Sequence, residues 1–579
     1  MAGVPLNPAE QAAEAVRGRM YDCIDRHKSF RLEAGAGAGK TYSLVEALKY
    51  LIDKNGVDLQ RKHQQVACIT FTNVATQEIE SRTDRHPVIR PSTIHSFCWF
   101  LIRNFQPALR AQLPKIERWS EILQEIGGLG SRRIGYDEFG HRDVDETSVA
   151  LHHDDVLTLA IELMKETKFR TLLAHRFPIL LIDEYQDTNK DLVEALKNHF
   201  LATGEGPFIG FFGDHWQKIY GYGCGGIEHP SLEVLGKGAN FRSVPAIVEC
   251  LNRMRPELPQ EVKDPKAQGY VGIYHTNGWP GKRLTGQHWR GDLPAGEAHA
   301  YLKLLKQRLE MEGWDLSAPQ TKILMLTHRV LAAEQGYGTI ASIFEYTDAY
   351  VKKEDSHIAF FCDVLEPVCA AYQGRKFGEM FAILGGGTTG VTTGSDKIAW
   401  ARDMDRLLEL RVSGTIGSVL DHLKKTHRPR LPEAVDRRER RLANPPQTPT
   451  DEESRSIERL RALREIPYRE VIALDRFIDD ETPFSTKHGV KGAEFQNVLV
   501  VFGRGWNQYD FNQFLEWGGS PNDVPSNRQD AYERNRNLFY VVCSRPKTRL
   551  AALFTQELSN PAMRTLEKWF GKASIHPLI

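Results

Sequence analysis

Short apolar runs closed by polar residues recur along the chain and alternate with amphipathic segments. The runs occupy residues 65–72 (QVACITFT), 178–183 (PILLID), 207–214 (PFIGFFGD), 322–327 (KILMLT) and 497–503 (NVLVVFG). Because continuous apolar runs suit strands that are buried on both faces, each is predicted to be a strand of a parallel sheet. Helical patterns lie between them, for example over 41–53 and 73–82. The alternation predicts an α/β fold that binds ligands at the carboxyl ends of its strands.

Two regions interrupt this alternation and are interpreted as insertions. Residues 101–158 are helical and loop-like, whereas residues 345–470 are helical and basic and end in a charged, proline-containing linker at 427–456. We therefore predict a first α/β domain from 1–100 and 159–239, and a second from 240–344 and 471–579. The stretch 385–397 (GGGTTGVTTGSDK) lacks a GK[ST] ending, so it is predicted to be a flexible surface loop and not a second phosphate site.

The composition indicates the general class of protein but does not identify its binding partners. A chain of 579 residues is too long to fold around a single hydrophobic core, so we expect several domains. Its contents of 41% hydrophobic and 26% charged residues are typical of soluble globular proteins. No apolar run reaches the roughly 18–20 residues that span a bilayer, and MAGVPLNPAEQ does not resemble a signal peptide. Eight scattered cysteines without CxxC indicate reduced thiols, so we expect a cytoplasmic protein. A formal net charge of zero neither supports nor excludes nucleic acid, which needs only a local basic lining.

A glycine-rich segment at 34–41 (AGAGAGKT) precedes a helical pattern and is predicted to bind nucleotide phosphates. Only its first residue departs from the G-x-x-x-x-G-K-[ST] pattern, in which glycines let backbone N–H groups face phosphate oxygens. Lys40 is expected to reach the β- and γ-phosphates, and Thr41 to hold Mg²⁺ at the helix N-terminus. A plain turn of small residues is the alternative. The predicted loop comprises Ala34, Gly35, Ala36, Gly37, Ala38, Gly39, Lys40 and Thr41.

The segment 180–188 (LLIDEYQDT) supplies the carboxylates that ATP hydrolysis requires. Asp183 and Glu184 follow an apolar strand pattern directly. Asp183 is expected to hold Mg²⁺, and Glu184 to orient and deprotonate the attacking water. Acidic strand ends are common, but the upstream phosphate loop and the following QDT favour the catalytic interpretation.

Eight segments in one order resemble the UvrD/Rep/PcrA group of superfamily 1 helicases. They are AGAGAGKT, TFTNVATQEIESR (70–82), STIHSF (92–97), LIDEYQDTN (181–189), GDHWQKIY (213–220), NFRSVPAIVECLN (240–252), TKHGVKGAEF (486–495) and NLFYVVCSR (537–545). The resemblance implies two RecA-like P-loop NTPase domains with ATP and Mg²⁺ between them, and 3′-to-5′ movement on single-stranded DNA. HHDDVLTLA (152–160) also resembles a family helix start, so its histidines are interpreted as part of that start and not as metal ligands.

The resemblance also implies roles for further residues. Gln217 would sense the γ-phosphate, while Arg242 and Arg545 would act as arginine fingers on the transition-state charge. Phe241 would stack on adenine and Glu494 would bind ribose. Gln11 resembles the adenine-reading glutamine, but its spacing from LN differs by one residue, so a plain helix-start residue is the alternative.

Residues that follow predicted strands are expected to contact single-stranded DNA by stacking and backbone contacts. They are Phe71, Asn73, Thr93, His95, Tyr220, Tyr222 and His488. Core packing is the alternative for the aromatics, and burial is the alternative for the two histidines. After Tyr222 the family's usual arginine is missing, and Lys218 replaces the usual serine after the sensor glutamine. The link between ATP state and stepping therefore departs from the family pattern.

These features predict an ATP-dependent DNA helicase or translocase, with a role in DNA repair or recombination, acting on single strands and strand junctions. The alternative is a DNA-end-sensing ATPase subunit of an anti-phage defence complex, because compact UvrD-like proteins of similar length serve beside an endonuclease in Gabija-type systems. The first insertion is short, and no nuclease cassette follows 548–555, so any nuclease is expected to be a separate partner. A binding module with an inactive ATP site is disfavoured because all the catalytic motif residues are present. RNA is disfavoured because TFTN, STIHSF and KGAEF match the DNA-acting branch.

Overall fold

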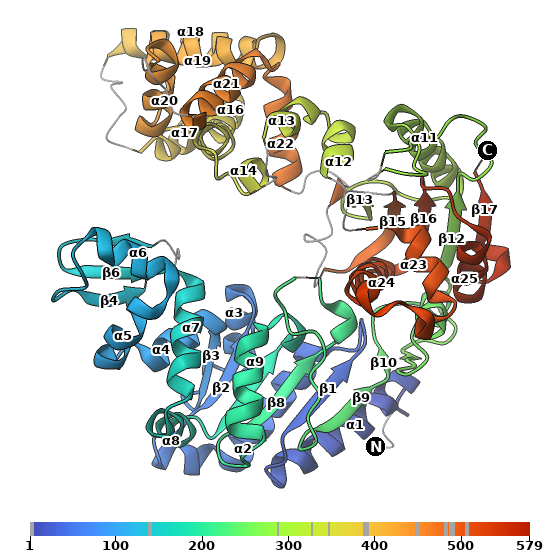
Figure 1. Ribbon diagram of the computed structural model, residues 1–579. Helices are drawn as coiled ribbons and strands as arrows, with labels where there is room; N and C mark the ends of the chain where they lie inside the picture. The colour runs from blue at the N-terminus through green and yellow to red at the C-terminus, as the bar shows by residue number, and fades with distance from the viewer. Residues whose placement is uncertain are drawn as a thin grey trace. The chain divides into compact units, whose positions relative to one another are not determined.

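The computed structural model describes residues 5–136, 142–219, 221–286, 289–325, 328–344, 348–385, 393–445, 451–479, 484–485, 493–503 and 509–578 (Figure 1). The chain forms two compact units. The first comprises Met1–Val271, Gln513–Leu550 and Asn560–Ser574, and the second comprises Gly272–Asn512, Ala551–Ser559 and Ile575–Ile579. Among the described residues, no helix combines the length and the apolar character that crossing a membrane would need.

The first unit is built on a six-stranded sheet with the order β3-β2-β7-β8-β1-β9, and all its neighbouring strands are parallel. Its strands are β1 (Phe30–Ala34), β2 (Val66–Thr70), β3 (Ile89–Thr93), β7 (Ile179–Asp183), β8 (Phe208–Gly213) and β9 (Glu233–Lys237). Every residue of β2, β7 and β8 is buried, as the continuous apolar runs predicted.

Helices cover both faces of this sheet and create two cores. One core packs α1 (Pro8–Asp25) and α2 (Lys40–Arg61) against Leu32 and Leu181. The other packs α4 (Ile94–Ile102), α7 (His153–Met164) and α9 (Lys190–Leu196) against Leu180 and Ile182. Successive β7 residues therefore serve opposite cores, as the period of a strand requires. The helices α3 (Asn73–Arg82) and α8 (Thr167–Arg176) complete this part of the chain.

The helix start predicted at 152–160 is confirmed. His152 is the N-cap of α7, and its side chain accepts a hydrogen bond from the Asp154 amide. Asp155 returns a bond by accepting from the His152 amide, at 2.9 Å. The pair satisfies backbone donors that a helix N-terminus otherwise leaves unpaired.

The insertion at 101–158 was predicted to be helical and loop-like, and this was incomplete. It contains α5 (Gln106–Gln112) and α6 (Glu117–Glu125), but also a three-stranded sheet of order β4-β6-β5. Its strands are β4 (Arg133–Tyr136), β5 (Asp143–Val144) and β6 (Ser148–Leu151). Ile134, Val149 and Leu151 join the core that holds Trp119. These strands are very short and lie among glycines and charged residues, so their alternation of apolar and polar residues was not recognisable in the sequence.

The remaining elements of the first unit carry the motifs from the later part of the chain. They include η4 (His215–Gln217), β10 (Ala239–Asn240), β11 (Glu261–Val262), α10 (Pro245–Met254), α24 (Gln529–Cys543) and α25 (Asn560–Phe570). β10 and β11 pair in parallel, and α10 packs against α24 and α25. The residues at 240–252 and 537–545 therefore belong to the same compact unit as the phosphate loop.

The second unit contains another six-stranded sheet, with the order β14-β13-β15-β16-β12-β17. Its strands are β12 (Tyr270–His275), β13 (Thr321–Met325), β14 (Phe484–Ser485), β15 (Phe495–Phe502), β16 (Pro546–Phe554) and β17 (Ile575–Pro577). β13 is parallel to β14 and β15, and β12 is parallel to β17. The strand predicted at 322–327 is thus confirmed to Met325, and residues 326–327 lie outside the described part. Two parallel sheets flanked by helices confirm the α/β fold class.

The second insertion is helical, as predicted. Its helices are α14 (Asp348–Val351), α15 (Ser356–Phe360), α16 (Glu366–Gln373), α17 (Phe377–Ile383), α18 (Gly394–Ser413), α19 (Ile416–Thr426), α20 (Glu433–Ala443), α21 (Asp451–Glu465) and α22 (Arg469–Ile478). The other helices of this half are α11 (Ala295–Met311), α12 (His328–Gln335), α13 (Gly338–Ile343) and α23 (Phe511–Gly518). The domain boundaries drawn from the sequence remain a prediction.

The prediction of a linker at 427–456 was wrong over most of that segment, because α20 and the start of α21 lie there. Its charges pair along and between helices. Arg437 contacts Glu433 at 2.9 Å, one turn away, and the buried Glu439 forms ion pairs with Lys424 and Arg464. Spacing of this kind supports a helix that few apolar residues would mark. Residues 386–392 of the loop predicted at 385–397 lie outside the described residues. The prediction was wrong for residues 394–397, which begin α18 after the N-cap Thr393.

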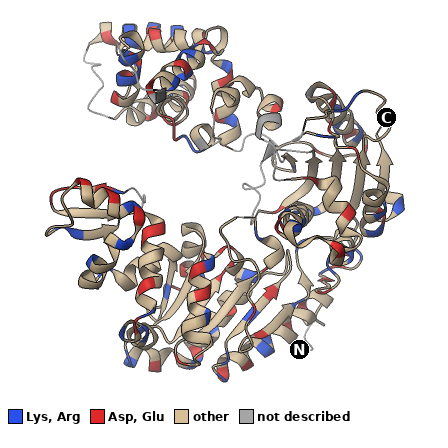
Figure 2. Cartoon of the chain, viewed as in Figure 1, with Lys and Arg blue, Asp and Glu red and all other residues tan. Residues whose placement is uncertain are grey.

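Charges of both signs are interspersed along the helices, whereas the strands of both large sheets are mostly uncharged (Figure 2). This distribution accords with the net charge of zero. Any anionic ligand must therefore be recognised by local groups, which lie at the strand ends and loops described next.

Candidate active site

The glycine-rich segment connects β1 to α2 and bends sharply. Gly37 and Gly39 have φ angles of 74° and 71°, a conformation that side chains disfavour. A Cβ at Gly37 would lie 2.8 Å from the Arg242 Cβ and from the Asn240 Oδ1, and one at Gly35 would lie 2.6 Å from the Gln260 Nε2. A side chain at Gly37 would combine this φ with a clash against the Arg242 Cβ, and one at Gly35 would displace the Gln260 amide, so the loop's backbone is shaped by its neighbours as well as by its own sequence.

The residues around β10 and β11 hold this loop by hydrogen bonds. Asn240 Nδ2 and Gln260 Nε2 both donate to the Ala36 carbonyl, at 3.1 and 3.0 Å. The Phe241 amide donates to the Gly37 carbonyl at 2.9 Å. Sequence reasoning missed both polar side chains. Asn240 begins the NFRS segment and could have been found there, whereas Gln260 had no signal.

The acidic strand end faces the loop's lysine. Glu184 follows the last residue of β7, and its carboxylate Oε1 lies 3.3 Å from the Lys40 Nζ. Its φ of 48° is unusual for a residue with a side chain, and such strain is concentrated at functional sites. Gln186 donates to the Glu184 carboxylate and fixes its direction. Asp183 is 6% exposed at the end of β7, and Thr41 is the second residue of α2.

The predicted sensor and finger residues also meet in the first unit. Gln217, at the end of η4, donates to the Asp214 Oδ2 at 2.6 Å and accepts from the Arg545 Nη2 at 3.1 Å. Arg242 donates to the Ser544 carbonyl at 2.9 Å. Burial and the nearby charge of Arg242 lower the pKa of Arg545. The positive charges of Arg242 and Arg545 disfavour each other, so an anion between the two guanidinium groups would stabilise both.

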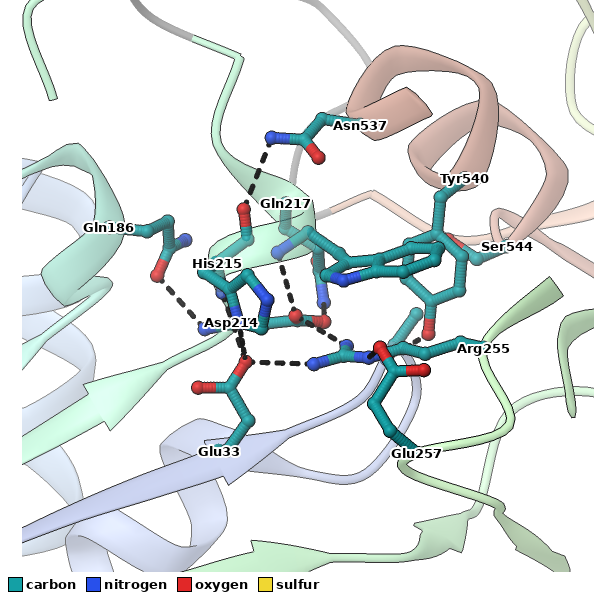
Figure 3. Close-up of polar contacts among 12 residues, drawn as sticks. Glu33, Gln186, Asp214, His215, Gln217, Arg255, Glu257, Asn537, Tyr540 and Ser544 are labelled. Atoms are coloured by element: carbon teal, nitrogen blue, oxygen red, sulfur yellow. Dashed lines mark hydrogen bonds and ion pairs between the residues drawn. The ribbon is translucent and has the colours of Figure 1, made fainter. Parts of the chain in front are cut away.

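A buried ion network lies beside Gln217, and sequence reasoning missed it (Figure 3). Arg255 donates to the Asp214 Oδ1 at 2.6 Å and to the Glu33 Oε1 at 2.9 Å. His215 Nδ1 also lies 2.6 Å from the Glu33 Oε1, and Tyr185 donates to the other oxygen. The strand ends of β1 and β8 are thus tied to the residue that follows α10. Little in the sequence signalled this network, because Glu33 is one of two charged residues in the five-residue strand β1 (FRLEA).

Electrostatics in this network favour the charged forms. Burial raises the pKa of Glu33, but hydrogen bonds and charges from His215, Tyr185 and Arg255 outweigh it and hold that pKa well below its usual range. Burial lowers the pKa of Arg255, and the carboxylate of Asp214, with Tyr540 and Glu33, raises it further than burial lowers it. Glu33, Asp214 and His215 could together hold a metal ion. Because Arg255 already neutralises both carboxylates, we interpret them as an ion-pair network.

A cavity of about 510 Å³ adjoins the loop at Gly39. Phe241, 38% exposed, lines it, as do Leu6, Tyr42 and Lys237. Lys237 Nζ donates to the Ser43 Oγ at 2.7 Å, and burial lowers the pKa of Lys237 to about 8. The placement fits the predicted adenine-stacking role of Phe241.

The other two residues predicted to contact the nucleotide, Gln11 and Glu494, do not line this cavity. Gln11 donates to the Leu6 carbonyl at 2.8 Å and is not among the cavity's lining residues, which fits the alternative of a helix-start residue. Glu494 belongs to the second unit and immediately precedes β15.

Substitution of Phe241 tests the cavity. We expect Phe241→Ala to raise the KM for ATP about tenfold with little change in kcat, because stacking contributes about 1–3 kcal/mol per base. Steady-state hydrolysis measures both constants. Val234→Ala, at an exposed β9 position that does not line the cavity, is the matched control. An unchanged KM in Phe241→Ala would show that the base binds elsewhere.

The predicted DNA contacts of the early motifs lie at one edge of the first sheet. β2 and β3 pair in register, Thr70 opposite Thr93. Phe71, half-buried, and Asn73, exposed at the start of α3, therefore follow a strand end next to that of Thr93. Thr93 also caps α4 by accepting from the Ser96 amide, so it has a structural role of its own.

His95 is half-buried, with its ring 4.9 Å from that of His153. Burial, with the charge of His153, lowers the pKa of His95 to about 4, so its ring is neutral near pH 7. A neutral ring can stack on a base but adds no charge. Tyr222 is 56% exposed. Tyr220 and His488 lie outside the described residues, so their predicted DNA contacts stay predictions.

Comparison with known proteins concerns these same residues. A family model described as an AAA domain matches residues 21–222, which include the loop, the acidic strand end and Gln217. Gabija protein GajB of Bacillus cereus is 22% identical, over 96% of this chain and 97% of GajB. The ATP-dependent DNA helicases PcrA of Staphylococcus aureus and Staphylococcus epidermidis are 24% and 25% identical, over 38% of this chain and 37% of each relative. By these matches the chain is similar to the UvrD/PcrA-like superfamily 1 helicases.

Proposed function

We propose that the chain is a DNA-stimulated ATPase that moves 3′ to 5′ on single-stranded DNA and serves an anti-phage defence complex beside a separate nuclease. The observation that carries the defence role is the extent of similarity. The match to GajB spans nearly the whole of both chains, whereas the match to PcrA spans little more than a third. A shared arrangement of insertions as well as ATP motifs would explain that difference.

The geometry supports ATP hydrolysis by named side chains. Lys40 leaves its ion pair with Glu184 and takes up the β- and γ-phosphates, because a phosphate oxygen competes well for the same ammonium group. Thr41 would provide an oxygen ligand for Mg²⁺, and Asp183 would hold the ion through its outer shell. When bound, the ion would neutralise charge on the phosphates. Glu184, released from Lys40 and oriented by Gln186, accepts the proton of the attacking water.

The two arginines stabilise the charge that develops on the transferred phosphoryl group. Arg242 and Arg545 approach from segments of the chain that also contact the loop and Gln217. Such fingers contribute about 10³–10⁵ in rate. Gln217 bonds both Arg545 and Asp214, so it connects the phosphate side of the site with the end of β8. We propose that this connection couples hydrolysis to DNA held at the neighbouring strand ends.

DNA substrates test this proposal. We expect circular single-stranded DNA to raise the hydrolysis rate at least tenfold, a barrier reduction of about 1.4 kcal/mol. A translocating motor needs no end, so linear strands should stimulate similarly. Stimulation only by linear DNA would instead indicate end sensing, and no stimulation by any DNA would contradict the motor. Displacement of a labelled strand from duplexes with 3′ or 5′ overhangs then reports direction, with 3′ overhangs expected to be used.

A stand-alone helicase in repair or recombination is the second candidate, because the similarity to PcrA favours it. The two candidate functions differ in whether the chain needs a partner nuclease. A nuclease encoded beside this chain that co-purifies with it supports the defence role. Efficient unwinding by the isolated chain, with no such neighbour, supports the repair role.

A further inference from the structure

A second cavity, of about 750 Å³, lies in the first unit between α10, α24, α25 and the residue before Gln217. Within the described part of the chain, it shares no lining residue with the cavity at Gly39 that Phe241 lines. The two cavities are therefore distinct, and nothing in the proposed hydrolysis uses the second one. Its volume lies within the range of about 300–1,000 Å³ that small-molecule sites occupy.

Aromatic rings form much of its wall. They belong to Trp216, Phe514, Tyr532, Phe539, Tyr540 and Trp569. The Phe514 ring centroid lies 5.6 Å from that of Tyr532, 5.5 Å from that of Phe539 and 5.8 Å from that of Trp569. All of these rings except Trp216 are at most 6% exposed, so they form a rigid and largely buried wall for an occupant.

The charged groups of the cavity are mainly cationic. Among the described residues, Arg253, Arg536 and Lys568 line it together with a single acid, Glu257, and Arg253 pairs with Glu249 at 3.3 Å. Glu257 already accepts an ion pair from the Arg255 Nε at 3.3 Å. The cavity therefore presents an excess of positive charge next to its aromatic wall.

Arg536 is the cation best placed to meet a ligand. Its guanidinium carbon lies 4.5 Å from the Trp216 ring centroid, and its Nε and Nη2 both donate to the Asn537 Oδ1. Among the residues that the structure describes, it has no carboxylate at ion-pair distance. Burial lowers the pKa of Arg536, although the nearby Glu533 opposes the effect. An anion would thus gain a planar, partly desolvated partner with donors to spare.

We propose that this second cavity binds a free nucleotide, its base against the aromatic wall and its phosphates against Arg536 and Lys568. A nucleotide combines a planar base with a polyanion, and the cavity combines an aromatic wall with two cations, Arg536 and Lys568, that have no carboxylate at ion-pair distance among the described residues. An occupant would contact Trp216, which directly precedes Gln217, and Tyr540, whose hydroxyl lies 3.4 Å from the Ala36 amide nitrogen. This site is additional to the one that the proposed motor function uses.

Equilibrium dialysis of the purified full chain against labelled ADP tests the proposal. We expect two equivalents of ADP to bind per chain. Arg536→Gln and Lys568→Gln should each weaken the second equivalent at least about tenfold, because each removes a charge-assisted contact. Arg564→Gln, an exposed position of α25 outside the cavity lining, should retain both equivalents.

Three outcomes would overturn the proposal. The first is one equivalent in the unaltered chain, and the second is a second equivalent that neither substitution weakens. The third is displacement of the second equivalent by a single-stranded oligonucleotide, which would assign the cavity to DNA. Phe241→Ala identifies the other equivalent, because it should weaken only binding beside the loop. Lys568 is exposed, so its substitution also tests the cavity if Arg536→Gln disturbs folding.

Discussion

Replacement of Glu184 by Gln is expected to lower ATP hydrolysis about 10²–10⁴-fold, the usual contribution of a positioned general base. The amide cannot take the proton of the attacking water, but it has nearly the same shape. It also tolerates the same left-handed backbone, so the φ of 48° need not change. Loss of the ion pair frees Lys40, so nucleotide binding should be unchanged or tighter.

Single-turnover hydrolysis and nucleotide binding should be measured on the same preparation. Asp191→Asn is the matched control, because Asp191 is an exposed acid on α9 that no proposed step uses. Loss of binding together with hydrolysis would indicate that Glu184 supports the loop and not the chemistry. Hydrolysis within tenfold of the unaltered chain would assign the base to another residue.

The sequence predicted those parts of the fold that depend on local pattern. β7 and β8 are buried on both faces, so their apolar runs were unbroken, and α3 has the bounds that its pattern indicated. The phosphate loop was readable because glycine is required where Gly37 bends and neighbours approach. In each case the physical requirement falls on consecutive residues.

The parts that the sequence did not predict depend on contacts between distant residues. Arg255 and Glu33 are 222 positions apart, and neither lies in a motif that would pair them. Gln260 reaches the Ala36 carbonyl from a loop without any pattern. The helix α20 was hidden for a different reason, since charge pairs support it more than an apolar stripe does.

The ion network around Arg255 should have the largest effect on stability. We expect Arg255→Met to lower the free energy of unfolding by about 3–5 kcal/mol, because it leaves Glu33 and Asp214 buried without their cation. Urea unfolding followed by tryptophan fluorescence measures the change. Arg253 is exposed and lies two positions before Arg255, so Arg253→Met should change the free energy of unfolding by less than about 0.5 kcal/mol.

Acid unfolding should distinguish the ionic network from simple packing. The folded-state pKa of Glu33 is lowered, so its stabilisation is fully present above the unfolded pKa of about 4.3 and is lost as pH falls below that value. Glu33→Gln should therefore reduce the pH dependence of stability below about pH 4.5. An unchanged acid profile would show that another carboxylate controls unfolding there.

A double substitution then separates the pair from its surroundings. If Glu33 and Arg255 stabilise each other, Glu33→Gln combined with Arg255→Met should cost less than the two single changes summed, by about 0.5–3 kcal/mol. Arg255→Lys is the informative intermediate, because it keeps the charge but lacks the planar fork that reaches both Glu33 and Asp214. Since Asp214 in turn orients Gln217, a folded Arg255→Lys chain should bind ATP normally yet hydrolyse it more slowly. Normal hydrolysis in that chain would show that Gln217 keeps its position without the bridge, and would restrict Arg255 to stability.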